Sequence, residues 1–163
     1  MNPQLLVDEI PEEGLLIDLW STQHAWLHGA MQQALHDHFL PNDDVHLTLN
    51  VVRLGRNVDM IGGLFMRVHA TCDRCLREFS VSQQIPIHMV MAPAGSVEET
   101  ASDPTDDDLN FSLYHGRHID LEGLICEQVV LAQPMQTLCT PDCKGLCPRC
   151  GVDLNQGACQ CGG

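Results

Sequence analysis

The chain has 163 residues, which suits one ordinary domain or a domain of about 100 residues with a small appendage. Its 22 acidic and 8 basic side chains give a formal net charge of -14. Neutralisation of phosphates supplies most nucleic-acid affinity, so this charge disfavours direct binding to naked RNA or DNA and favours a basic protein partner. Hydrophobic residues make up 44% of the chain and aromatic residues 4%, so a core must rest on aliphatic side chains and methionine.

The N-terminal residues predict a protein that stays in the cytoplasm. No apolar run approaches the roughly 20 residues needed to span a bilayer. The start lacks the basic region of a signal peptide, and Asp8 and Glu9 interrupt it early. Without an export signal, the nine cysteines should be reduced thiols, so metal binding is favoured over disulfides.

The first third of the chain predicts two short extended segments and one helix. The extended segments are residues 5–10 and 14–20, on either side of a turn at 11–13. Apolar residues then recur at steps of three and four, which predicts a helix from about residue 23 to 39. Ser21 or Thr22 could cap this helix, and Pro41 lies beyond its end.

The middle of the chain has the two-residue period of β-strands. From Val45 to Val52 apolar and polar residues largely alternate, and further extended runs cover residues 58–71 and 79–91. Gly62-Gly63 is expected to form a bulge or bend in the second run. These runs predict an antiparallel meander in which Cys72 to Cys75 occupy a turn between strands.

Residues 93–108 are expected to form a mobile acidic loop. A short extended piece at 111–114 follows, and Asp120 then caps a helix over 121–132 that Pro134 ends. The predicted fold class is α+β, with an antiparallel β-meander or partial barrel, two packed helices and a C-terminal cysteine-rich segment. We expect an α+β domain over residues 1–134 and a zinc-binding tail over 135–163.

The tail carries the strongest chemical signal in the chain. Its six cysteines are Cys139, Cys143, Cys147, Cys150, Cys159 and Cys161. Cys147-Pro-Arg-Cys150-Gly151 places two sulfurs across a tight turn, where Pro148 sets the turn and Gly151 allows a positive φ. We therefore predict a structural zinc site. Four thiolates around zinc leave no place for a catalytic water.

The choice of ligands stays open at this point. Cys147 and Cys150 are the firmest pair, and the other two ligands could be Cys159 and Cys161, or one of those with Cys139 or Cys143. An iron–sulfur cluster is an alternative, but the spacing matches no ferredoxin pattern.

A second cysteine pair lies in Cys72-Asp-Arg-Cys75-Leu76. The preferred interpretation is a packed turn with two partly buried thiols. A second metal, with His69 or His88 as a further ligand, is the alternative. Redox chemistry is disfavoured because β-type sequence lies on both sides, whereas thioredoxin-like pairs begin a helix. Cys126 is expected to be a small core residue in the second helix.

No other motif points to catalysis. The pairs His24/His28, His36/His38 and His115/His118 have spacings that a metal could use, but no carboxylate or cysteine is arranged with them, so solvated or core histidines are preferred. The sequence has no nucleophile elbow, phosphate loop or dinucleotide fingerprint. We therefore expect a protein that is not an enzyme.

Three motifs, taken in order, resemble the YceD family, the large ribosomal RNA subunit accumulation proteins of bacteria and chloroplasts. They are Cys72-Asp-Arg-Cys75-Leu76 after a β-rich run, Ile119 to Pro134 (IDLEGLICEQVVLAQP) after an acidic gap, and Cys143 to Asn155 (CKGLCPRCGVDLN) in the tail. The resemblance covers roughly residues 45 to 161. It implies a role in accumulating large-subunit ribosomal RNA and hence in ribosome assembly, with no catalytic activity and with metal bound by the tail cysteines.

The charge and the resemblance together predict a basic ribosomal protein or a pre-ribosomal particle as partner. The alternative is a zinc module that binds RNA directly, because Arg74, Arg77, Lys144 and Arg149 lie near the cysteine motifs and could form local basic patches. No membrane and no small-molecule substrate are expected.

Overall fold

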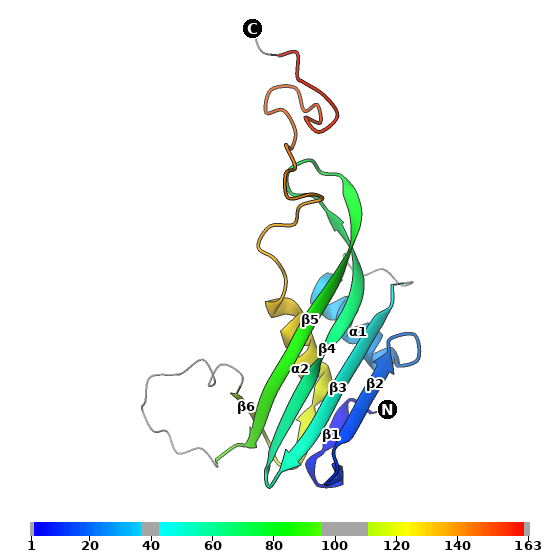
Figure 1. Ribbon diagram of the computed structural model, residues 1–163, viewed down its shortest axis with the longest axis vertical. Helices are drawn as coiled ribbons and strands as arrows, with labels where there is room; N and C mark the ends of the chain where they lie inside the picture. The colour runs from blue at the N-terminus through cyan, green and yellow to red at the C-terminus, as the bar shows by residue number, and fades with distance from the viewer. Residues whose placement is uncertain (1, 37–42, 96–110, 162–163) are drawn as a thin grey trace.

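The computed structural model describes residues 2–36, 43–95 and 111–161. Its main sheet has five strands in the order β2-β3-β4-β5-β6, and the helices α1 and α2 lie behind it in Figure 1. The strand bounds are β2 Leu15–Trp20, β3 Val45–Leu54, β4 Asn57–Thr71, β5 Glu78–Pro93 and β6 Phe111–Tyr114. The helices are α1 Ala25–Leu35 and α2 Leu121–Leu131. The α+β prediction is confirmed.

A second sheet of two strands contains the N-terminal strand of the chain. It pairs β1 (Gln4–Leu6) with β7 (His118–Asp120), and a single 3₁₀ turn, η1 (Val7–Glu9), follows β1. Residues 5–10 are therefore part strand and part turn, where one extended segment was predicted. None of the described helices has the length and hydropathy needed to cross a bilayer.

Both predicted helices are present, with shorter bounds. The first starts at Ala25 with His24 in an extended conformation before it, and residues 37–39 of its predicted range lie outside the described residues. Asp120 stands at the cap position of α2 as predicted, but its side chain makes no capping hydrogen bond. Asp120 instead accepts a hydrogen bond from the Gln4 side chain and so links α2 to β1. Most of the predicted acidic loop also lies outside the described residues.

The antiparallel meander is confirmed, but the strand register corrects the bulge predicted at Gly62-Gly63. Strands β2 to β5 pair antiparallel with their sequence neighbours, whereas β6 pairs parallel to β5. Gly62 and Gly63 pair with Leu49 and Thr48 in continuous register, so of the expected bulge or bend the bulge does not form. Glycine is needed at 62 because a Cβ there would stand 2.0 Å from the Thr48 carbonyl oxygen.

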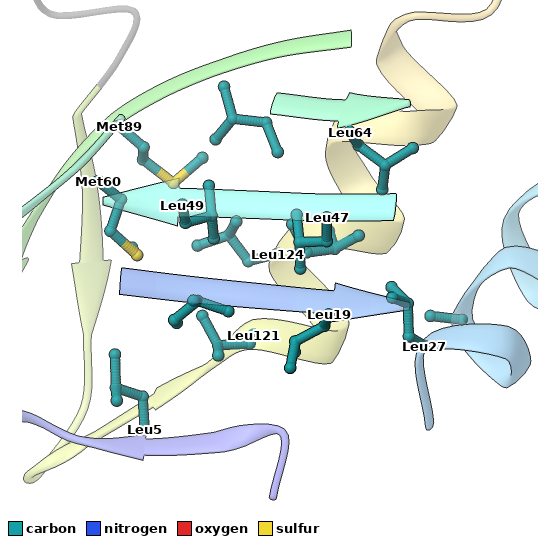
Figure 2. Packing of buried hydrophobic residues seen from close by; sticks show 14 of the residues in the cluster. Leu5, Leu19, Leu27, Leu47, Leu49, Met60, Leu64, Met89, Leu121 and Leu124 are labelled. Atoms are coloured by element: carbon teal, nitrogen blue, oxygen red, sulfur yellow. The ribbon is translucent and has the colours of Figure 1, made fainter. Parts of the chain in front are cut away.

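The hydrophobic core lies between the sheet and the two helices. Alternate residues of β2, β3 and β4 point to this side, and Figure 2 shows Leu19 and Leu47 beside Leu121 and Leu124 of α2. Burying aliphatic side chains stabilises the fold at about 25 cal/mol per Å² of apolar surface. The two-residue period of the strands thus places one face of the sheet in the core and leaves the other face outside.

The β4–β5 hairpin extends beyond the rest of the sheet. β3 pairs with β4 only as far as Met66, whereas β4 and β5 continue to pair up to Thr71 and Glu78. The tip of this hairpin, residues 72–77, therefore stands clear of the helix-covered core. The cysteine-rich tail runs past the same tip in Figure 1.

Candidate metal centre

Eight of the nine cysteines gather into two groups of four at this end of the molecule. The inner tetrad consists of Cys72, Cys75, Cys139 and Cys143. The outer tetrad consists of Cys147, Cys150, Cys159 and Cys161. Within each tetrad all four sulfur atoms lie within 4.8 Å of one another, and all nine cysteines are free thiols.

The outer tetrad is built from one short stretch of chain. The Cys147 sulfur lies 3.2 Å from that of Cys159, and the Cys150 sulfur lies 3.4 Å from Cys159. Backbone N–H groups point at two of these sulfurs: Arg149 donates to Cys147 at 3.4 Å and Cys161 to Cys159 at 3.2 Å. Gly151 has the positive φ of 72° that its motif predicted.

The inner tetrad joins two distant parts of the chain. Its first two cysteines come from the hairpin tip and the other two from the start of the tail. The Cys72 and Cys143 sulfurs are 3.7 Å apart, as are those of Cys75 and Cys139. Cys72, Cys75 and Cys143 are buried, with Leu138, Leu146 and Phe79 packed around them.

In the outer tetrad, neighbouring thiols compete for ionisation. The N–H groups of Arg149 and Cys150 and the Cys159 thiol lower the pKa of Cys147 to about 6. The Cys161 N–H lowers the pKa of Cys159, but the adjacent cysteine side chains outweigh it and raise that pKa to about 12. One thiol therefore ionises readily while its neighbour keeps its proton, because two adjacent negative charges repel.

The inner tetrad has the same division. Burial raises the pKa of Cys72, but surrounding backbone N–H groups outweigh burial and lower it to about 6. The Arg77 N–H lowers the pKa of Cys75, whereas burial and the other thiols of the tetrad raise it to about 12. A divalent cation among the sulfurs would remove this repulsion and let all four ionise.

The sulfur positions fit a tetrahedral metal ion. Four sulfurs about 2.3 Å from a central zinc lie about 3.8 Å from one another. The inner distances of 3.7 Å match this value, and the outer distances of 3.2 and 3.4 Å are slightly shorter. A disulfide needs about 2.05 Å between its sulfurs, so neither tetrad is a set of disulfides. Each tetrad can hold one metal ion.

The predicted ligands are divided between the two tetrads. Cys147, Cys150, Cys159 and Cys161 come together, which was one of the ligand sets left open. Cys139 and Cys143 lie with the hairpin tip instead. The preferred interpretation of Cys72 and Cys75 was a packed turn with two partly buried thiols. The turn is present, but both thiols are buried, and the interpretation missed the two tail cysteines that they meet. As ligands, all eight cysteines remain predictions.

Cysteine counting could have found this grouping. Cys126 sits on α2, and the remaining eight cysteines make two sets of four. The structure places Cys126 apart from both tetrads and only half-buried, so it is not the core residue that was expected. The two histidines considered as extra ligands are paired elsewhere: His69 with Asp43 at 3.1 Å and His88 with Asp59 at 3.5 Å.

The fold and this site together define an α+β protein whose helix-covered sheet carries a cysteine-rich end with two tetrads that could each hold a metal ion. The family described as "Large ribosomal RNA subunit accumulation protein YceD" matches residues 62–163, a span that includes both tetrads. The chain belongs to the YceD family, and the sequence resemblance is confirmed.

Curated mycobacterial relatives agree with this assignment. Uncharacterised proteins of Mycobacterium bovis and Mycobacterium tuberculosis are each 32% identical over 108 residues, which is 66% of this chain and 50% of theirs. An uncharacterised protein of Mycobacterium leprae is 28% identical over 110 residues, or 68% of this chain and 49% of its own. The chain thus spans about half the length of these relatives. No solved structure matches it.

Proposed function

We propose that the protein is a cytoplasmic, non-enzymatic factor in ribosome assembly that supports accumulation of large-subunit ribosomal RNA. The observation that carries this proposal is the family match over residues 62–163. The site supports the absence of catalysis, because a metal ion held by four thiolates has no open position for a substrate or a water.

We also propose that the outer tetrad holds a structural Zn²⁺. All four ligands come from residues 147–161, a stretch whose only described β-pairing is the isolated bridge between Leu146 and Asp153. Zinc is the usual ion for four cysteines in a tetrahedral structural site, and its binding energy can order a segment too short to build a core.

The uncovered face of the main sheet supports a protein partner. Large apolar side chains lie on this face in two rows across β2, β3 and β4. In one row Leu16 and Ile61 pair with Asn50 from either side, and in the other Trp20 and Phe65 pair with His46. Leu16 is 72% exposed and Phe65 is 51% exposed. Exposed apolar side chains gathered on one face indicate an interaction surface.

The charges around these side chains favour a basic partner. Trp20 and Phe65 border a hollow of ≈ 360 Å³ that Asp43 and Asp44 also line, with Arg67 as its one arginine or lysine. Asp18 and Asp59 lie on the same face of the sheet. Aromatic rings beside carboxylates suit the lysine and arginine side chains of a basic ribosomal protein.

Direct RNA binding is the weaker alternative, since the three arginines among the four basic residues near the cysteines are engaged within the site. The Arg74 guanidinium donates to the Cys143 carbonyl at 3.0 Å, and that of Arg149 donates to the Cys161 carbonyl at 3.1 Å. Arg77 lies against the Cys139 sulfur, and this contact raises the pKa of Arg77. These guanidiniums stabilise the metal-binding end, which leaves them less available for phosphates.

The experiment is capture of partners from lysate at low and high salt, with and without nuclease. We expect basic ribosomal proteins or large-subunit precursor particles at low salt, retained after nuclease and lost at high salt. Replacing both Trp20 and Phe65 with Ala should abolish capture. Leu131→Ala, a matched change at an exposed position on α2, should leave it intact.

Two outcomes would count against this proposal. If no ribosomal protein or precursor particle is captured at low salt, the assembly role is contradicted. If capture is lost on nuclease treatment and the pure protein binds RNA with a steep salt dependence, the RNA-binding alternative replaces it. In cells that lack the protein, the ratio of large-subunit to small-subunit ribosomal RNA should fall and should recover on re-expression.

A further inference from the structure

The inner tetrad brings together sulfurs that are far apart in the sequence. Its two sulfur–sulfur contacts join residues separated by 71 and 64 positions. Its four side chains form a small cluster apart from the main hydrophobic core, with few other apolar residues around it. Such a cluster buries little apolar surface, so another interaction has to hold the tail against the hairpin.

The hairpin tip has the same backbone turn as the motif in the outer tetrad. In the tip, the Cys72 N–H donates to the Arg77 carbonyl at 2.9 Å, and the Leu76 N–H donates to the Cys72 carbonyl at 2.9 Å. In the tail, Cys147 donates to Val152 at 2.8 Å and Gly151 to Cys147 at 2.9 Å. Residue for residue, the two turns have the same hydrogen-bond pattern.

The residue after the second cysteine has a positive φ in both turns. Gly151 adopts 72° at no steric cost, whereas Leu76 adopts 57° although it is a leucine. Leu76 is 64% exposed, so packing of its side chain does not explain this conformation. The turn that presents the Cys72 and Cys75 sulfurs therefore holds a backbone conformation that leucine seldom adopts.

The tail meets this turn through its backbone as well as its cysteines. The Asp73 N–H donates to the Thr137 carbonyl at 2.9 Å, and the Leu146 N–H donates to the Arg74 carbonyl at 3.0 Å. Gly145 lies so close that a Cβ there would stand 3.0 Å from the Arg74 carbonyl oxygen. The tail is thus hydrogen-bonded to the hairpin tip both before and after its two inner cysteines.

We propose that the inner tetrad is a second, separate zinc site, which fastens the tail to the tip of the β4–β5 hairpin. Zinc binding displaces the remaining thiol protons to solvent and leaves four thiolates around the ion, with a net charge of 2 - 4 = -2. Arg77, against the Cys139 sulfur, partly balances that charge. This proposal does not depend on the ribosomal role, because it is argued from the positions of the four sulfur atoms.

The two sites differ in what each needs in order to form. The outer ligands lie within 15 residues of chain, 147 to 161, so that site can assemble locally. The inner site needs the folded hairpin to present two of its ligands. Loss of the inner ligands should therefore free the tail but leave the outer zinc in place.

The test is Co²⁺ titration of the full-length reduced protein, followed by absorption from sulfur-to-cobalt charge transfer. We expect two equivalents for the wild-type chain and one for the variant with Cys72→Ser and Cys75→Ser. The variant with Cys150→Ser and Cys159→Ser should also bind one. The matched control Cys126→Ser, outside both tetrads, should bind two. Cys75→His, which keeps a metal-binding side chain, should restore the second equivalent that a serine there removes.

Two results would overturn the proposal. One is a single equivalent in the wild-type protein. The other is two equivalents in the variant that lacks both Cys72 and Cys75. Circular dichroism of each variant, compared with the wild-type spectrum, separates loss of the ligand from loss of the fold, because the sheet and helices lie outside the inner tetrad.

Discussion

In the body of the molecule, formed by the main sheet and its two helices, alternate strand residues pack against α1 and α2 in a continuous hydrophobic core. In the metal-binding end, formed by residues 72–77 and 137–161, the apolar cluster consists mainly of cysteines. The body can therefore fold by burial of apolar surface, whereas on our proposal metal ions order the end. On our proposal the chain has two sources of stability, and removal of the metal ions should leave the body folded.

Removing metal should have the largest effect, and it should be confined to one region. After chelation under reducing conditions, the backbone amides of residues 137–161 should lose protection from hydrogen exchange, whereas those of β2, β3 and β4 should keep theirs. Hydrogen exchange read by mass spectrometry checks this, with Zn²⁺ added back as the control. Equal protection of the end before and after chelation would contradict the comparison.

Truncation of a core side chain should destabilise the body of the molecule and leave the metal-binding end intact. Leu47 is fully buried between the sheet and the helices, so Leu47→Ala should lower the free energy of unfolding by about 2–5 kcal/mol. Denaturant unfolding in saturating Zn²⁺ measures this change, and the outer zinc should remain bound. The exposed control, Leu54→Ala, should change stability by less than about 0.5 kcal/mol. Loss of outer zinc in Leu47→Ala would show that the two regions are not separable.

Asn155 offers a sharper test because it lies between Cys150 and Cys159 in the chain and contacts a sulfur of the inner tetrad. Its side-chain N–H donates to the Cys143 sulfur at 3.3 Å, and its side-chain oxygen accepts from the Lys144 N–H at 2.8 Å. Groups that hold metal ligands in place typically account for 10–100-fold in affinity, so Asn155→Ala should weaken inner-site zinc about tenfold.

A competing chelator measures that affinity, and the neighbouring residue supplies a control. Gln156 hydrogen-bonds only to Asp153 among the described contacts, so Gln156→Ala should leave inner-site affinity unchanged. Equal affinities in the two variants would mean that Asn155 does not support the inner site.

The smallest effect is expected at Leu76. A left-handed conformation costs a leucine about 1–2 kcal/mol, and glycine removes that cost but gains freedom in the unfolded chain. Leu76→Gly should therefore tighten inner-site zinc by less than about fivefold. The same competition assay checks this, with Gly151→Ala as the opposite change at the matching position of the outer tetrad. A tenfold loss in Leu76→Gly would show that the leucine side chain itself is required.

Sequence periodicity was enough for the body, because both its strands and its helices bury one face. Val45, Leu47 and Leu49 alternate with polar residues, and their two-residue period predicted β3 and the meander. The parallel pairing of β6 had no such signal, since a four-residue segment carries no information about which strand it joins. Gly62 was misinterpreted for a similar reason: a bulge and a close backbone approach both select glycine.

The sequence indicated that the cysteines of this end could bind metal, but not which cysteines lie together. The spacing of Cys147 and Cys150 indicated a metal turn, and the same spacing at Cys72 and Cys75 was given less weight. Only the fold shows that the hairpin tip and the start of the tail meet, because that contact depends on how far β4 and β5 extend beyond β3.

We propose that metal ions, rather than an apolar core, organise the C-terminal end. Native mass spectrometry of the protein purified in reducing buffer, combined with alkylation of accessible thiols, tests it most directly. We predict two zinc ions per chain and eight protected cysteines, with only Cys126 alkylated. A metal-free protein whose residues 137–161 nevertheless stay protected from hydrogen exchange would contradict the account.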